Sequence, residues 1–277
     1  MSVERLYPFA GDHAIQSAVV VAEWAELGGS KPLSSDILQN LERDAKPQLT
    51  KLGLTHHEQL NVLEVKMGAG QQTSHASSAL GGFKSASRST MGSDERRSVV
   101  LARENCIIQI NDYTRWADAV RDIREYLNVL LPSIGQFAPI RHLTLQFNDV
   151  FLWKAPSEEL NMTEVFRTGT VWLPKHVFGL TNLWHSHHGY FADKSEPCQF
   201  QQLDNVNVSR AVVDGLHSIQ ALVAHRASLA QPIWVREPLS EDDDILKILG
   251  QFHTDNKRIL ADLFSNEVLR SINLNAS

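Results

Sequence analysis

Apolar and polar residues alternate along two stretches of the chain, and a helical period separates them. Over residues 100–110 apolar side chains fall on one strand face, apart from a charged break at Glu104. From Tyr113 to Leu130 the apolar positions recur every three or four residues, which is the spacing of one helix face. Alternation returns over residues 143–147. The pattern therefore predicts a long strand, an amphipathic helix and a second long strand between residues 98 and 153.

The same criteria predict the elements before residue 98. Residues 14–24 read as an apolar strand, and Ser34 or Ser35 can cap a helix that runs to about Lys51 and ends at Gly53. A short strand is expected over residues 60–67 and another over 83–89. Between them, residues 68–82 are rich in Gly, Ser, Ala and Gln, which predicts an exposed turn or mobile loop.

Beyond residue 155 the pattern predicts a second group of strands followed by helices. A short helix is expected over residues 160–166, and strand-like runs cover 182–192, 199–212 and 217–229. Ser240 is the expected N-cap of the next helix, because the acidic run 241–244 would lie where the helix dipole favours negative charge. Ser265 can cap a last short helix.

Strands that follow one another through short turns, with helices at intervals, indicate an antiparallel α+β protein. We expect amphipathic helices on one face of the sheet or sheets. Pro156 and the acidic triplet after it mark a boundary. The chain is therefore expected to form two related sheet-plus-helix halves, residues 1–155 and residues 156–277.

Four segments carry a resemblance to a known family. They are the apolar strand at residues 13–20, the Tyr-x-x-Trp sequence at 113–116, the Arg-led strand 140–148 that ends in Asn, and a C-terminal helix with His253 four residues before Lys257. Together they resemble a sporadically distributed bacterial family of uncharacterised α+β proteins. The resemblance implies a non-membrane protein scattered among bacteria and mobile elements, and it implies no particular reaction. Patchy occurrence of this kind is typical of defence or toxin–antitoxin genes.

Composition narrows the class of protein. The 277 residues are 43% hydrophobic and 21% charged, which is ordinary for globular chains. The two cysteines favour buried free thiols in a reducing compartment. No stretch has the length and apolar character of a spanning helix or a signal peptide, so we expect a cytoplasmic protein without membrane contact. The net charge of −6 and the lack of a basic cluster give no indication of nucleic-acid binding.

A histidine cluster is the most suggestive candidate chemistry. On a strand, His185 and His187 would project from one face, and two imidazoles at this spacing can share one Zn²⁺. The third ligand would come from a neighbouring strand, with His225, Asp204 or His142 as candidates. The alternative is that these histidines form ordinary hydrogen bonds at a surface or interface. Apart from this zinc, the sequence predicts no cofactor.

Polar residues line one face of two predicted strands. One row is formed by His142, Thr144, Gln146 and Asn148, and the other by Gln201, Asn205 and Asn207. These rows are either a solvated sheet face or a polar groove for a ligand or partner. Uncharged amides and hydroxyls suit hydrogen-bonded recognition better than acid–base catalysis.

The sequence supports two hypotheses about the function of the protein. The chain has no Gly-x-Ser-x-Gly, His-Glu-x-x-His or Cys-x-x-Cys sequence. The first hypothesis is therefore a non-enzymatic binding or regulatory protein that recognises a protein partner, with a defence or toxin–antitoxin setting implied by the resemblance. The alternative is a metal-dependent hydrolase or nuclease effector that uses the His185/His187 cluster. The sequence leaves the partner, the substrate and the oligomeric state open.

Overall fold

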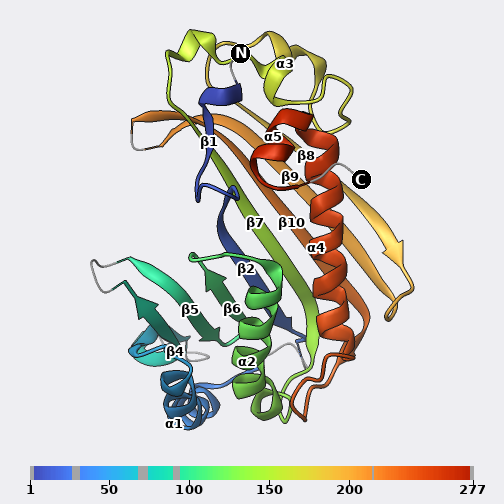
Figure 1. Cartoon of the computed structure of the whole chain (residues 1–277). Coiled ribbons are helices and arrows are strands. Elements are labelled where there is room, and N and C mark those ends of the chain that lie inside the picture. Colours follow the sequence, from blue (N-terminus) through green and yellow to red (C-terminus); the bar gives the residue numbers. More distant parts are fainter. Residues whose placement is uncertain (1–2, 27–31, 68–73, 90–93, 214, 275–277) are drawn as a thin grey trace.

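The computed structural model describes residues 3–26, 32–67, 74–89, 94–213 and 215–274 (Figure 1). Its strands are β1 (Leu6–Pro8), β2 (Ile15–Trp24), β3 (His56–Met67), β4 (Ser74–Arg88), β5 (Glu95–Ala102), β6 (Asn105–Ile110), β7 (Ile140–Trp153), β8 (Trp184–Lys194), β9 (Phe200–Val213) and β10 (Leu216–Ile233). Its α-helices are α1 (Ser35–Lys51), α2 (Trp116–Ile134), α3 (Met162–Val165), α4 (Asp244–Leu263) and α5 (Asn266–Ser271).

All the described strands join one open antiparallel sheet. Its order is β3-β4-β5-β6-β2-β7-β10-β9-β8, and β1 pairs with the far end of β7. A strand, a helix, an antiparallel meander and a long helix follow one another twice along the chain, beginning at β2 and again at β7. These two strands pair with each other at the centre. The predicted antiparallel α+β class is confirmed. Strands from before and after residue 155 belong to the same sheet.

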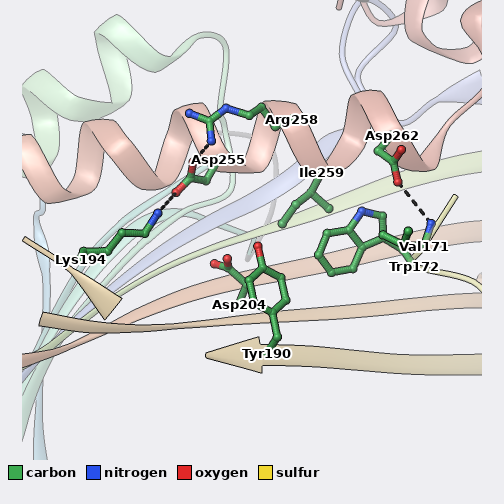
Figure 2. A pocket seen from close by; sticks show the side chains of 9 residues that line it. All are labelled: Val171, Trp172, Tyr190, Lys194, Asp204, Asp255, Arg258, Ile259 and Asp262. Carbon is green, nitrogen blue, oxygen red and sulfur yellow. Dashed lines mark hydrogen bonds and ion pairs between the residues drawn. The ribbon is translucent and has the colours of Figure 1, made fainter. Parts of the chain in front are cut away.

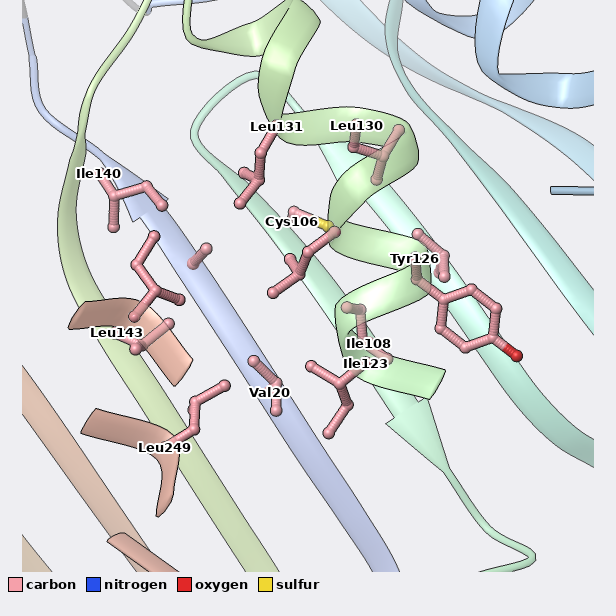
Figure 3. Close-up of a cluster of buried hydrophobic side chains, with 14 of the residues drawn as sticks. Val20, Cys106, Ile108, Ile123, Tyr126, Leu130, Leu131, Ile140, Leu143 and Leu249 are labelled. Carbon is pink, nitrogen blue, oxygen red and sulfur yellow. The ribbon is translucent and has the colours of Figure 1, made fainter. Parts of the chain in front are cut away.

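The helices pack on one face of this sheet (Figure 1), as the amphipathic patterns predicted. Burial alternates along β7: Leu143, Leu145 and Phe147 are fully covered, whereas the residues between them remain partly exposed. Figure 3 shows the core under α2, where Ile123 of α2 and Leu249 of α4 lie near Val20 of β2. No helix within the described residues packs on the other face of the sheet, which is called the uncovered face below.

A second hydrophobic cluster lies at the opposite end of the sheet. Phe264, which follows α4, stacks on Phe166 with ring centroids 5.4 Å apart and contacts Phe151 of β7 at 5.1 Å. All three rings are buried. The side chains of α3 and α5 complete this cluster, so the C-terminal helices are fixed to the end of the sheet by aromatic packing.

Local signals account for several helix ends. The Ser34 hydroxyl accepts a hydrogen bond from the Ile37 amide and caps α1, and Ser265 caps α5 in the same way. Gly53 follows α1 with φ +89°, a left-handed conformation that glycine adopts without strain. The predicted positions of α1 and α5 are confirmed.

The long strand expected over residues 100–110 is wrong, because the chain turns back at Arg103 and Glu104. Leu101 of β5 pairs with Cys106 of β6, so the segment forms a hairpin. Both side chains point into the covered face and are buried. Apolar residues continue on both sides of a two-residue turn that lacks Gly and Pro, and this is why the turn left no clear signal in the pattern.

The exposed loop expected over residues 68–82 is also wrong in its second half. Residues 68–73 lie outside the described residues, but β4 begins at Ser74 and pairs with β3 on one side and β5 on the other. A Cβ atom on Gly82 would lie 2.3 Å from the carbonyl oxygen of Leu101. The small residue is therefore needed for close strand contact, and its role is not that of a turn former.

The last long helix begins later than the sequence predicts. Asp243 is the N-cap of α4, and the Ser240 hydroxyl donates to its carboxylate at 2.8 Å. Residues 240–243 form a turn before the helix. Among the described residues, no helix combines the length and apolar character needed to span a membrane.

Candidate functional site

The uncovered face of the sheet brings the two predicted polar rows together. On β7, His142, Thr144, Gln146 and Asn148 point away from the helices and are partly exposed. On β9, Gln201, Asn205 and Asn207 point the same way. In the sheet register, Gln146 faces Ala224 of β10, which in turn faces Asn205. The rows are thus two strands apart, or about 10 Å, and share one surface.

Some of these polar groups bond to one another, and others do not. The Asn148 amide donates to Gln16 at 2.8 Å, and His142 Nδ1 lies 3.1 Å from the Ser228 hydroxyl. Across the sheet, His187 Nε2 lies 3.0 Å from the Asn205 amide oxygen. The face is therefore a network of neutral donors and acceptors with room for further hydrogen bonds at its surface.

A hollow of about 570 Å³ lies at one end of this face. Its lining includes Glu23, Trp24, Arg141, His142 and Arg226. The Arg226 guanidinium forms an ion pair with Glu23 and so neutralises that carboxylate. Burial lowers the pKa of His142, and the Arg226 charge lowers it further. The imidazole is therefore uncharged at neutral pH and acts there as a hydrogen-bonding group.

The four residues proposed to bind zinc do not converge. His185 and His187 on β8 lie exposed on the uncovered face, whereas Asp204 and His225 are buried on the face under α4. The sheet itself separates the two pairs. His142 shares the uncovered face with the β8 histidines, but β10 and β9 lie between their strands. Within the described part of the chain, no group of three or more His, Cys, Asp or Glu side chains is placed to hold a metal ion.

Asp204 and His225 instead belong to a buried polar network. The Asp204 carboxylate lies 2.5 Å from His225 Nδ1 and accepts from Gln202 at 2.8 Å. Burial raises the pKa of this carboxyl, but the hydrogen bonds from His225, Gln202 and Tyr190 outweigh that effect and lower it. The His225 ring is fully buried and stacks on Phe252. No substrate can reach an imidazole in this position.

A pocket of about 240 Å³ adjoins this network, between α4, β8 and β9 (Figure 2). Asp255 accepts from Gln202 at 3.0 Å and forms ion pairs with Arg258 at 2.8 Å and Lys194 at 3.8 Å. Tyr190 stacks on Trp172 at its wall. The pocket is smaller than most small-molecule sites, and its charged groups already have partners. We assign it a structural role, which is to hold α4 on β8 and β9.

The sequence analysis did not identify Tyr190, Asp255 and Arg258 as members of this network. Asp255 and Arg258 are one turn apart on α4, and Asp255 lies next to the apolar stripe of that helix. This spacing was the sequence signal that could have indicated their ion pair. Among the tryptophans, Trp24, Trp153 and Trp172 are buried in the core, whereas Trp234 is 45% exposed.

Comparisons with protein-family models, with curated proteins and with solved structures find no match to this chain.

Proposed function

We propose that this protein is a non-enzymatic binding or regulatory protein that receives a protein partner on the uncovered face of its sheet. The observation that carries the proposal is the contrast in burial along β7. Leu143 and Leu145 are buried under helices, whereas Thr144 and Gln146 between them face outward with nothing packed on them in the described structure. We propose that this broad face is the binding platform.

The chemistry of the face favours a polypeptide partner. Amides and hydroxyls on β7 and β9 alternate with partly exposed apolar residues such as Val19, Val21 and Leu222 on the neighbouring strands. This mixture of apolar contact and neutral hydrogen bonding is typical of protein interfaces. Arg226, one of the cations in the hollow, is paired with Glu23, and the whole chain carries a net charge of −6. A nucleic-acid backbone would find little positive charge here.

The hollow at the end of the face supplies an anchoring point. Its lining includes Trp24, Arg141 and His142. The strongest contacts of an interface are usually made by a side chain that enters such a hollow, surrounded by weaker contacts that exclude water. We place the anchor of the partner in this hollow and the flanking contacts along the two polar rows.

No observation favours the alternative, a metal-dependent hydrolase, since its four candidate ligands lie on opposite faces of the sheet. We further propose a cytoplasmic setting in a bacterial or mobile-element context. Both cysteines are free thiols, and burial raises the pKa of Cys106 to about 12, which makes that thiol unreactive.

Gentle purification from the source cells tests the proposal. We expect one polypeptide to co-purify in a fixed ratio and to be identifiable by mass spectrometry. After purification of that polypeptide, Gln146→Arg on β7 should raise its Kd by about tenfold or more, because a long charged side chain would occupy the centre of the face. The matched control is Glu125→Arg, at an exposed position of α2, which should leave the Kd unchanged.

Several results would contradict the proposal. One is a chain that purifies alone under mild conditions, and another is equal affinity of both arginine variants for the partner. Metal analysis of the same sample tests the alternative, because stoichiometric zinc that is lost in His185→Ala would favour the hydrolase. A high absorbance at 260 nm would indicate nucleic acid in place of a protein.

A further inference from the structure

The two edge strands of the sheet differ in how they are protected. At one edge, β3 carries the exposed Glu58, and its pairing with β4 shifts register between Leu60 and Asn61. Charged side chains and bulges are common means of preventing edge-to-edge association. At the other edge, β8 pairs with β9 in an unbroken register from Trp184 to Lys194 and contains no proline. Edge strand β8 lacks the register shift that interrupts β3.

Strand β8 is also long and open to solvent. It spans 11 residues, and within the described ranges no strand pairs with its outer edge (Figure 1). Phe191 is 65% exposed on the uncovered face, and Tyr190 is 44% exposed on the other. A long, regular edge strand with exposed aromatic rings is a template for another strand.

We propose that β8 pairs with β8 of a second copy of this chain, forming a symmetric dimer through one continuous sheet. Antiparallel pairing of two identical strands requires a two-fold axis perpendicular to the sheet. That axis keeps the helix-covered faces of both copies on the same side. Directly opposite residues then have numbers whose sum is even, because opposite side chains in an antiparallel pair share a face.

The number of paired residues and hydrogen-bond complementarity select the register centred on Gly189. In that register all 11 residues of β8 pair, and His185 of one copy faces Asp193 of the other, twice in each dimer. His187 then lies opposite Phe191, where the exposed ring gains a cover. Gly189 pairs with itself on the axis. A cross-strand pair in which an imidazole N–H donates to a carboxylate stabilises a sheet, whereas like charges directly opposite destabilise it.

The dimer would extend the uncovered face from one chain to the other, since His185, His187 and Phe191 lie on that face of β8. This inference is independent of partner binding. It concerns the purified chain alone, so its failure leaves the proposed function standing, and failure of the proposed function leaves the dimer standing.

Sedimentation velocity of the purified protein over a wide concentration range tests the inference. We expect a concentration-dependent species of twice the 31.1 kDa chain mass. Asp193→Lys should weaken the dimer by about tenfold, since it removes the carboxylate that accepts from His185 in both symmetric contacts. His185→Asp should weaken it similarly, and the double variant H185D/D193K should restore it. Thermal unfolding of each variant checks that the fold is intact.

Two controls make the test specific. Glu58→Lys is a matched charge reversal on the opposite edge and should leave the dimer unchanged. H187D/D193K should fail to restore it, because residues 187 and 193 do not face each other in this register. A chain that is monomeric at every concentration, a dimer indifferent to Asp193→Lys, or a rescue by H187D/D193K would each overturn the inference.

Discussion

Asp204 and Asn205 are neighbours on β9 but lie on opposite faces of the sheet, in opposite environments. Asp204 is 3% exposed under α4, where His225 and Gln202 bond to its carboxylate. Asn205 is partly exposed on the uncovered face and lies near His187. A polar group under the helices is costly to leave without a hydrogen-bond partner, because water cannot replace a missing partner there. Polar residues on the covered face therefore serve the fold, whereas those on the uncovered face are the ones that we propose for binding.

The largest expected effect comes from breaking the buried pair. Asp204→Ala leaves His225 and Gln202 without their acceptor, and we expect it to lower the free energy of unfolding by about 3–5 kcal/mol. The matched change on the uncovered face of the same strand, Asn207→Ala, should alter it by less than about 0.5 kcal/mol. Denaturant titration measures both. Comparable losses from the two substitutions would contradict the division between the faces.

The second prediction concerns the pH dependence of the free energy of unfolding. Burial raises the pKa of Asp149 on the covered face of β7 to about 7. Between about pH 4 and pH 7, the folded chain therefore keeps a proton on Asp149 that the unfolded chain has already lost. The free energy of unfolding falls as the pH rises through this window. We expect Asp149→Asn to remove this loss and to stabilise the protein at pH 8 by up to about 4 kcal/mol.

Unfolding titrations of the wild type and this variant at pH 5 and pH 8 measure the difference. The control is Asp242→Asn, because the side chain of Asp242 is 98% exposed and its removal should leave the pH dependence unchanged. A stability difference between Asp149→Asn and the wild type that stays constant with pH would show that the folded-state carboxyl titrates normally.

Much of the fold could be predicted because its signals are local. The period change at residue 113, the serine caps of α1 and α5 and the strand runs after residue 180 all appear within short windows of sequence. The turn at Arg103 and Glu104 was missed because no Gly or Pro marks it. The first part of strand β4 was missed because Gly81 and Gly82 are required by close contact with β3 and β5, which is information from distant parts of the chain.

The candidate site could be predicted only in part for the same reason. The polar rows on β7 and β9 follow from alternation within each strand, and the structure places both on one face. The zinc set combined residues from different strands, and a single sequence does not tell which face of one strand matches that of another. The link from Asp204 through Gln202 to Asp255 depends on how α4 crosses the sheet, and the link from Asp204 to Tyr190 depends on the register of β8 against β9. No local pattern encodes either.

Site-specific photo-crosslinking tests the central claim, partner binding on the uncovered face, most directly. A benzophenone amino acid would replace Gln146 or Asn207 on the uncovered face, and Glu125 or Thr254 at exposed positions of the helices. Irradiation in the source cells should join the same partner polypeptide to the two sheet positions and leave the two helix positions unmodified. Adducts that form from the helices, or equally from all four positions, would contradict the account.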